Sequence, residues 1–122
     1  MTQYMMMIYA PTEPLAADDP ANQLDRWIEF DKSLHAQGVH VADHRLHDLD
    51  TATTVRVRDG ETLISDGPFA ETKEYLAGYY VLDCPDLDTM LAIAARAPIV
   101  HRGAVEVRPV MQVALPQEQA AG

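Results

Sequence analysis

The sequence has little positive charge and a single cysteine, and each shortage excludes a class of partner or bond. Nine Lys and Arg stand against nineteen Asp and Glu, which gives a formal net charge of -10 at pH 7. Because such a chain repels phosphate backbones and anionic lipid, we expect neither nucleic acid nor a membrane surface as a partner. Cys84 has no partner for an internal disulfide, so we expect a cytoplasmic location.

Long hydrophobic runs and familiar ligand-binding motifs are also missing. The apolar stretch over residues 4–10 has no basic flank and is far shorter than the roughly 20 residues of a spanning helix. The sequence contains no Gly-rich phosphate loop, nucleophile-elbow serine, Cys-x-x-Cys pair or dinucleotide fingerprint. We therefore expect no cofactor, and cofactor-free chemistry stays open.

What is present is an ordinary globular composition, with 48% hydrophobic and 23% charged residues in a chain of 122. This length fits one domain. We predict a single domain over residues 1–113 and a flexible tail over 114–122.

The chain divides into alternating helical and extended patterns. Asp19 and Pro20 predict the cap and first position of a helix over 20–37, which Gly38 ends. Its apolar stripe, at helical spacing, has one polar member, Asp31. Asp59-Gly60 predicts a hairpin whose register sets Thr53 opposite Asp66. The remaining predicted elements are strands over 4–10, 39–41, 75–83 and 104–108, a loop after 41, and a second helix over 86–97.

This order predicts a ferredoxin-like split βαβ sandwich of the α+β class. Two helices cover only one face of such a sheet, yet the first strand is apolar on both faces. We therefore expect a second copy of the chain to cover the bare face, giving a homodimer. The two faces of this strand carry Tyr4, Met6 and Ile8, and Met5, Met7 and Tyr9.

The residues Asp66–Glu74, DGPFAETKE, resemble the signature of the DGPF group in the YCII-related family. The resemblance extends over residues 4–9, 51–60, 78–83, 86–88 and 105–110. It implies a dimeric α+β barrel of ferredoxin-like subunits. Its members are mostly uncharacterised, and some are associated with sigma-factor-like regulators. The broader family implies a catalytic His–Asp pair with an early histidine, and the first predicted helix here offers only His35, near its end.

Asp66 is the best candidate for an acid/base group. The hairpin register places its carboxylate on the same face as Val55 and Ile64, where apolar surroundings disfavour ionisation. Alternatively, it accepts backbone N–H bonds in the turn that Gly67 begins. We expect a concave pocket at Asp66, with His44 as a possible acid/base partner. The residues expected to contact a ligand there are Thr53, Arg56, Phe69, Tyr9 and Tyr80.

Histidines gather at His40, His44 and His47, near Asp43 and Asp48. On a strand His40 and His44 point the same way and His47 the opposite way, and the spacing matches no zinc motif. We therefore expect solvated histidines and no metal site.

Two hypotheses for function follow. The first is a small-molecule enzyme that needs no cofactor and uses Asp66 as its acid/base. The alternative is a non-catalytic dimeric module that binds a ligand or a regulator. The fold alone does not separate them.

Overall fold

The computed structural model describes residues 1–114, and a four-stranded antiparallel sheet forms its centre. The strand order is β2-β5-β1-β6, in which each neighbouring pair is antiparallel. These strands are β2 (His40–Arg45), β5 (Glu74–Cys84), β1 (Thr2–Pro11) and β6 (Ala104–Pro109). Two β-α-β crossovers in this order make the ferredoxin-like α+β fold that the sequence predicts.

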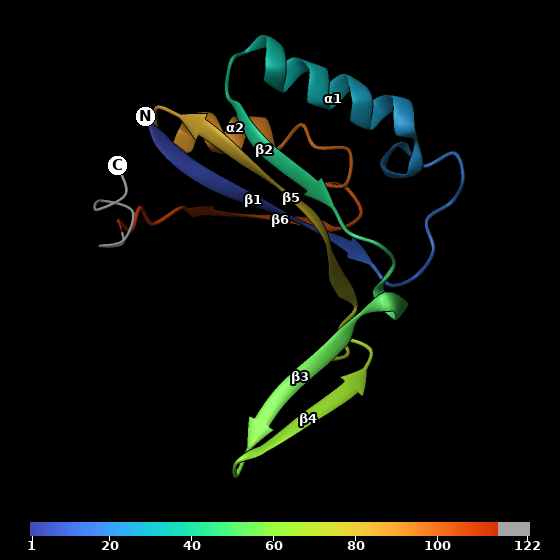
Figure 1. Cartoon of the computed structure of the whole chain (residues 1–122). Coiled ribbons are helices and arrows are strands. Elements are labelled where there is room, and N and C mark those ends of the chain that lie inside the picture. Colours follow the sequence, from blue (N-terminus) through green and yellow to red (C-terminus); the bar gives the residue numbers. More distant parts are fainter. Residues whose placement is uncertain (115–122) are drawn as a thin grey trace.

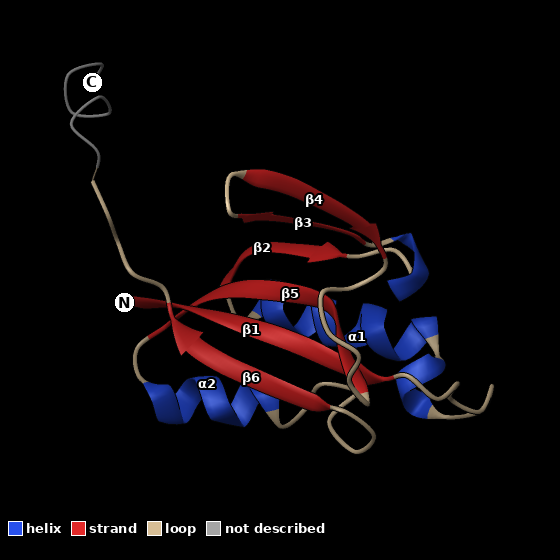
Figure 2. Ribbon diagram, turned by 90° about the horizontal axis from the view of Figure 1, so that it is seen from below, coloured by secondary structure: helices blue, strands red, loops and turns tan. Residues whose placement is uncertain are grey.

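Both α-helices of residues 1–114 lie on one face of the sheet. They are α1 (Leu24–Ala36), which follows β1, and α2 (Leu87–Ala94), which follows β5 (Figure 1). Seen from the other side, the four strands have no helix in front of them (Figure 2). None of the helices in this part of the chain is long and apolar enough to cross a membrane.

The core lies between the helices and the sheet. Alternate residues of β1, namely Tyr4, Met6 and Ile8, are buried there, whereas Met5 and Met7 on the opposite face are only half-buried. This alternation follows from the two-residue period of a strand, and it confirms the two apolar faces predicted for β1. The sheet therefore has one face covered by the helices, which holds the core, and one helix-free face on which β1 is still apolar.

The first predicted helix begins later than expected. Residues Pro20–Asn22 form a short 3-10 helix, η1, and the extended Gln23 separates it from α1. Asp19 caps η1 as predicted, since its side chain accepts the Ala21 N–H at 3.0 Å. Its other oxygen accepts a hydrogen bond from Arg102 Nε at 2.6 Å. The prediction of one continuous helix over 20–37 is wrong because two helical segments meet at Gln23.

Two other boundaries also differ from the prediction. The second helix occupies Leu87–Ala94 rather than 86–97, with the Asp86 side chain capping it at the Thr89 N–H. Isolated turns continue to Ala97. The strand predicted over 39–41 extends as β2 to Arg45, because backbone pairing with β5 carries the polar residues after Val41 into the sheet.

The hairpin of β3 (Thr53–Arg58) and β4 (Glu61–Asp66) forms a separate two-stranded sheet. Its register pairs Thr53 with Asp66 and Arg58 with Glu61, as predicted. The hairpin projects from the side of the sheet opposite the helices (Figure 1). It is therefore an insertion between β2 and β5. The flexible tail predicted for the C-terminus lies, from residue 115 on, outside the described residues.

Candidate functional site

A pocket of about 370 Å³ opens between α1 and the helix-covered face of the sheet. Its volume falls within the range of small-molecule sites, which are commonly apolar clefts with a few polar groups. Side chains from β1, the loop after β1, α1, β5 and the loop after α2 form its apolar walls. These include Ile8, Leu15, Trp27, Ile28, Ala77 and Ile99.

Trp27 is held in place by polar and aromatic contacts. The indole Nε1–H donates a hydrogen bond to the Ala21 carbonyl at 2.8 Å, and the ring packs edge-on against Phe30 at 6.3 Å. Because the indole is already held in one orientation, little side-chain entropy is lost when a ligand packs against it. The 3-10 helix η1 thus positions the largest apolar side chain of the pocket.

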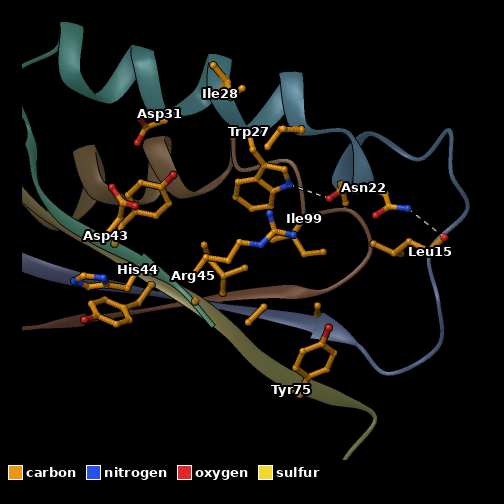
Figure 3. Close-up of a pocket in the computed structure, with 18 residues that line it drawn as sticks. Leu15, Asn22, Trp27, Ile28, Asp31, Asp43, His44, Arg45, Tyr75 and Ile99 are labelled. Atoms are coloured by element: carbon orange, nitrogen blue, oxygen red, sulfur yellow. Dashed lines mark hydrogen bonds between the residues drawn. The ribbon is translucent and has the colours of Figure 1, made fainter. Parts of the chain in front are cut away.

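Arg45 supplies the positive charge at this pocket. Its partner in the β-ladder is Gly78 of β5, and its side chain runs along the pocket toward Trp27 and Ile99 (Figure 3). Within residues 1–114, no carboxylate lies within 4.0 Å of its guanidinium. In a chain of net charge -10, this arginine is free to bind an anion.

The other end of the pocket is acidic. Asp31 of α1 and Asp43 of β2 lie there (Figure 3), and Tyr80 of β5, only 8% exposed, lines the same wall. Burial raises the pKa of Tyr80, and the negative charges of Asp31 and Asp43 raise it further. The Tyr80 hydroxyl therefore stays protonated at neutral pH and is a hydrogen-bond donor.

Comparison with known proteins places the chain in a family. The family model of the YCII-related domain matches residues 2–114. The chain belongs to the YCII-related family. It is also 46% identical over 67 residues to Uncharacterized protein R00369 of Rhizobium meliloti (strain 1021). That match spans 53% of this chain and 54% of the relative, so it covers about half of each protein.

In this YCII-related chain, the pocket brings together only part of the predicted site. Tyr80 and His44 both line the pocket. However, His44 is paired with Tyr79 in the β-ladder, its ring packs against the Tyr79 ring at 5.6 Å, and Figure 3 shows it directed away from Trp27. Tyr9 lies on the helix-free face of β1, between Ile8 and Ala10, which face the pocket.

The other predicted residues, Asp66, Thr53, Arg56 and Phe69, lie in or directly after the β3–β4 hairpin. None of them lines the pocket beside Trp27. Asp66 is exposed, and no hydrogen bond to its carboxylate occurs among the described residues. Arg56 instead donates to the Phe69 carbonyl at 3.0 Å, which ties the loop to the hairpin. The catalytic role of Asp66 stays a prediction.

Sequence reasoning missed the pocket residues Arg45, Trp27, Asp31 and Asp43. One signal was available, because Asp31 is the polar member of the otherwise apolar stripe of α1. A carboxylate at such a position faces the sheet, where it needs a partner or a ligand. Cys84, in contrast, is fully buried, and burial raises the pKa of its thiol, so it has none of the features of an activated nucleophile.

Proposed function

We propose that this chain binds a small organic anion in the pocket between α1 and the sheet. The apolar body of the ligand packs against Trp27 and Ile99, and its carboxylate or similar group binds Arg45. One observation carries the proposal: in a strongly acidic protein, the Arg45 guanidinium faces an apolar pocket and has no acidic partner among residues 1–114. Arginine matches a carboxylate with two parallel donors, so this placement favours an anion over a neutral molecule.

Trp27 is the only tryptophan of the chain, so its fluorescence reports directly on this pocket. Hexanoate has a carboxylate and an apolar tail, and hexan-1-ol is its neutral counterpart. We expect hexanoate to change the Trp27 emission to saturation. We expect the dissociation constant of hexan-1-ol, measured in the same way, to be at least about tenfold higher. Equal affinities for the two, or no saturable change with hexanoate, would contradict the proposal.

A cofactor-free enzyme that uses Asp66 is the second candidate function. Asp66 is the first residue of the segment that resembles the DGPF signature, so this candidate goes together with the proposed assignment to the DGPF group. The observation in its favour is the exposed Asp66 carboxylate, which no protein hydrogen bond engages in the part of the chain that the structure describes. Because the hairpin projects away from the helices, such a site would form on the other side of the sheet from Trp27. Tyr9 lies on that side, and the ring of His44, although His44 lines the pocket, is directed away from Trp27 (Figure 3).

We also propose that two copies pair through the helix-free face, as the sequence predicts. This face carries Met5 and Met7 beside Val81 and Tyr79 of β5, all half-buried. The hairpin on the same side exposes 69% of Ile64. The apolar surface of the two central strands β1 and β5 favours association with a second copy, with Glu106 and Arg108 of β6 beside it.

Sedimentation tests the dimer. The wild-type chain is expected to sediment at twice the mass of one chain. Met7→Glu is expected to shift it to the monomer, because it places an unpaired charge in the face that the dimer would bury, next to the acidic Glu106. Leu91→Glu makes the same chemical change at an exposed position of α2 and should leave the dimer intact. A monomeric wild type at micromolar concentration would refute the dimer.

A further inference from the structure

Three potential metal ligands, Asp31, His35 and His40, converge where α1 ends and β2 begins, and Asp43 contacts His40. Asp31 and His35 lie one helical turn apart on α1, with His35 Nε2 3.5 Å from Asp31 Oδ2. His40 and Asp43 lie on β2, with His40 Nε2 2.5 Å from Asp43 Oδ2. A short turn through Gly38, whose φ is 72°, joins the two elements and sets them side by side.

The two pairs form one cluster. The rings of His35 and His40 stack with their centroids 4.0 Å apart, and the ligand atoms of Asp31, His35 and His40 all lie within 4.8 Å of one another. Ligand atoms around a tetrahedral zinc ion are about 3.4 Å apart, as follows from bonds of about 2.1 Å. Binding a metal ion would therefore require these side chains to rotate toward one another; His35 is exposed, and Asp31 and His40 are half-buried.

The charges of the cluster also call for a cation. Within residues 1–114, neither Asp31 nor Asp43 forms a salt bridge with a lysine or arginine, and their ion-pair partners are His35 and His40. The imidazoles of His35 and His40, which contact these two carboxylates, are themselves common metal ligands. A cation bound between the two carboxylates would offset their negative charges.

We propose that Asp31, His35 and His40 bind a divalent transition metal ion of the zinc class, with Asp43 completing the site. Two imidazoles and two carboxylates suit zinc, cobalt or nickel, whereas magnesium and calcium prefer sites built from oxygen alone. The cation takes the position where His40 and Asp43 now contact each other directly. Sequence reasoning expected no metal here because it considered His44 and His47 instead of Asp31 and His35.

The site goes beyond the proposed binding of an organic anion and does not depend on it. Asp31 and Asp43 line the acidic end of the pocket, whereas Arg45 extends toward Trp27 (Figure 3). A metal at the acidic end would add a second positive charge to the same cavity. Loss of the metal ligands and loss of Arg45 therefore have separate consequences, and each proposal can fail alone.

The test uses the full chain without a histidine tag, treated with chelator and then dialysed against zinc or cobalt. We expect one zinc per chain at micromolar free zinc, and intense visible absorption from tetrahedral cobalt. His35→Asn and His40→Asn are each expected to weaken zinc binding at least about tenfold. Substitution of residues that only hydrogen-bond a metal ligand already lowers metal affinity by about this much. His35 is 55% exposed, so its substitution leaves the core untouched.

His101→Asn is the matched control, since His101 is exposed in the loop after α2 and lies outside the cluster. It should bind zinc as the wild type does, and millimolar magnesium should not displace the zinc. The proposal is overturned if the wild type binds no stoichiometric zinc, or if His35→Asn and His101→Asn bind it equally. Circular dichroism of each variant separates loss of the site from loss of the fold.

Discussion

Replacement of Arg45 by glutamine tests the positive charge of the pocket most simply. Glutamine keeps much of the length of the side chain and its capacity to donate hydrogen bonds, but it removes the charge. Because Arg45 is exposed and has no acidic partner in the described chain, the substitution breaks no ion pair. We therefore expect unchanged stability, within about 0.5 kcal/mol, as for most surface substitutions.

The loss in binding follows from the energy of one charged contact. Hydrogen bonds to charged groups contribute about 1.5–3 kcal/mol, and about 1.4 kcal/mol corresponds to a tenfold change in the dissociation constant. Since solvent reaches the Arg45 side chain, the lower end applies, and we expect hexanoate to bind about tenfold more weakly to Arg45→Gln. Titration of Trp27 fluorescence measures this change.

Two controls complete the experiment. Arg108→Gln removes an equal charge from β6, outside the pocket, and should leave hexanoate binding unchanged. Raising the salt concentration from about 0.1 M to about 1 M shortens the screening length from about 10 Å to about 3 Å, and so should weaken binding in the wild type more than in Arg45→Gln. The reasoning is refuted if Arg45→Gln binds hexanoate like the wild type, or if Arg56→Gln in the hairpin is the variant that loses binding.

Three further predictions concern the fold and Asp66. Met6 is fully buried, so Met6→Ala should lower the free energy of unfolding in urea by about 2–5 kcal/mol, and a loss below about 1 kcal/mol would place the core elsewhere. Hydrogen bonds from the Ala21 N–H and from Arg102 lower the pKa of Asp19 in the folded chain. The ionised Asp19 therefore stabilises the fold above the usual Asp pKa of about 4, and this stabilisation is lost as the pH falls through the lowered pKa of the folded state. Lowering the pH from about 6 to about 3 should therefore reduce the melting temperature of the wild type more than that of Asp19→Asn. Melting temperatures of the two proteins that fall in parallel with pH would contradict this. Asp66→Asn should leave the melting temperature unchanged, because no hydrogen bond holds that carboxylate within residues 1–114, and a clear drop would identify Asp66 as a turn anchor.

Local signals in the sequence predicted much of the fold. Alternating apolar residues in β1 indicated two apolar faces, and Asp59-Gly60 indicated the hairpin with its register. Both features depend on residues close together in the chain, so the pattern contains the information. The extent of β2 was not predictable in this way. Its polar residues from Asp43 to Arg45 are held by backbone bonds to β5, which leave no trace in side-chain periodicity.

The candidate site was less accessible to sequence reasoning because distant segments build it. The pocket combines Ile8, Trp27, Arg45, Tyr80 and Ile99 from five separate parts of the chain. Tyr80 was predicted, but as part of a site around Asp66 rather than of the pocket that Arg45 and Trp27 line. The hairpin is the reason: its register was predicted correctly, whereas its direction relative to the main sheet depends on the loops that flank it.

The central claim, an organic anion bound between Trp27 and Arg45, is tested most directly by nuclear magnetic resonance of the labelled chain during titration with hexanoate. The Trp27 indole N–H gives a single signal because the chain has one tryptophan. We predict that hexanoate shifts this indole signal and the Arg45 backbone amide, both to saturation at the same dissociation constant. Shifts confined to the amides of the hairpin around Asp66, or no saturable shift at the indole, would contradict the account.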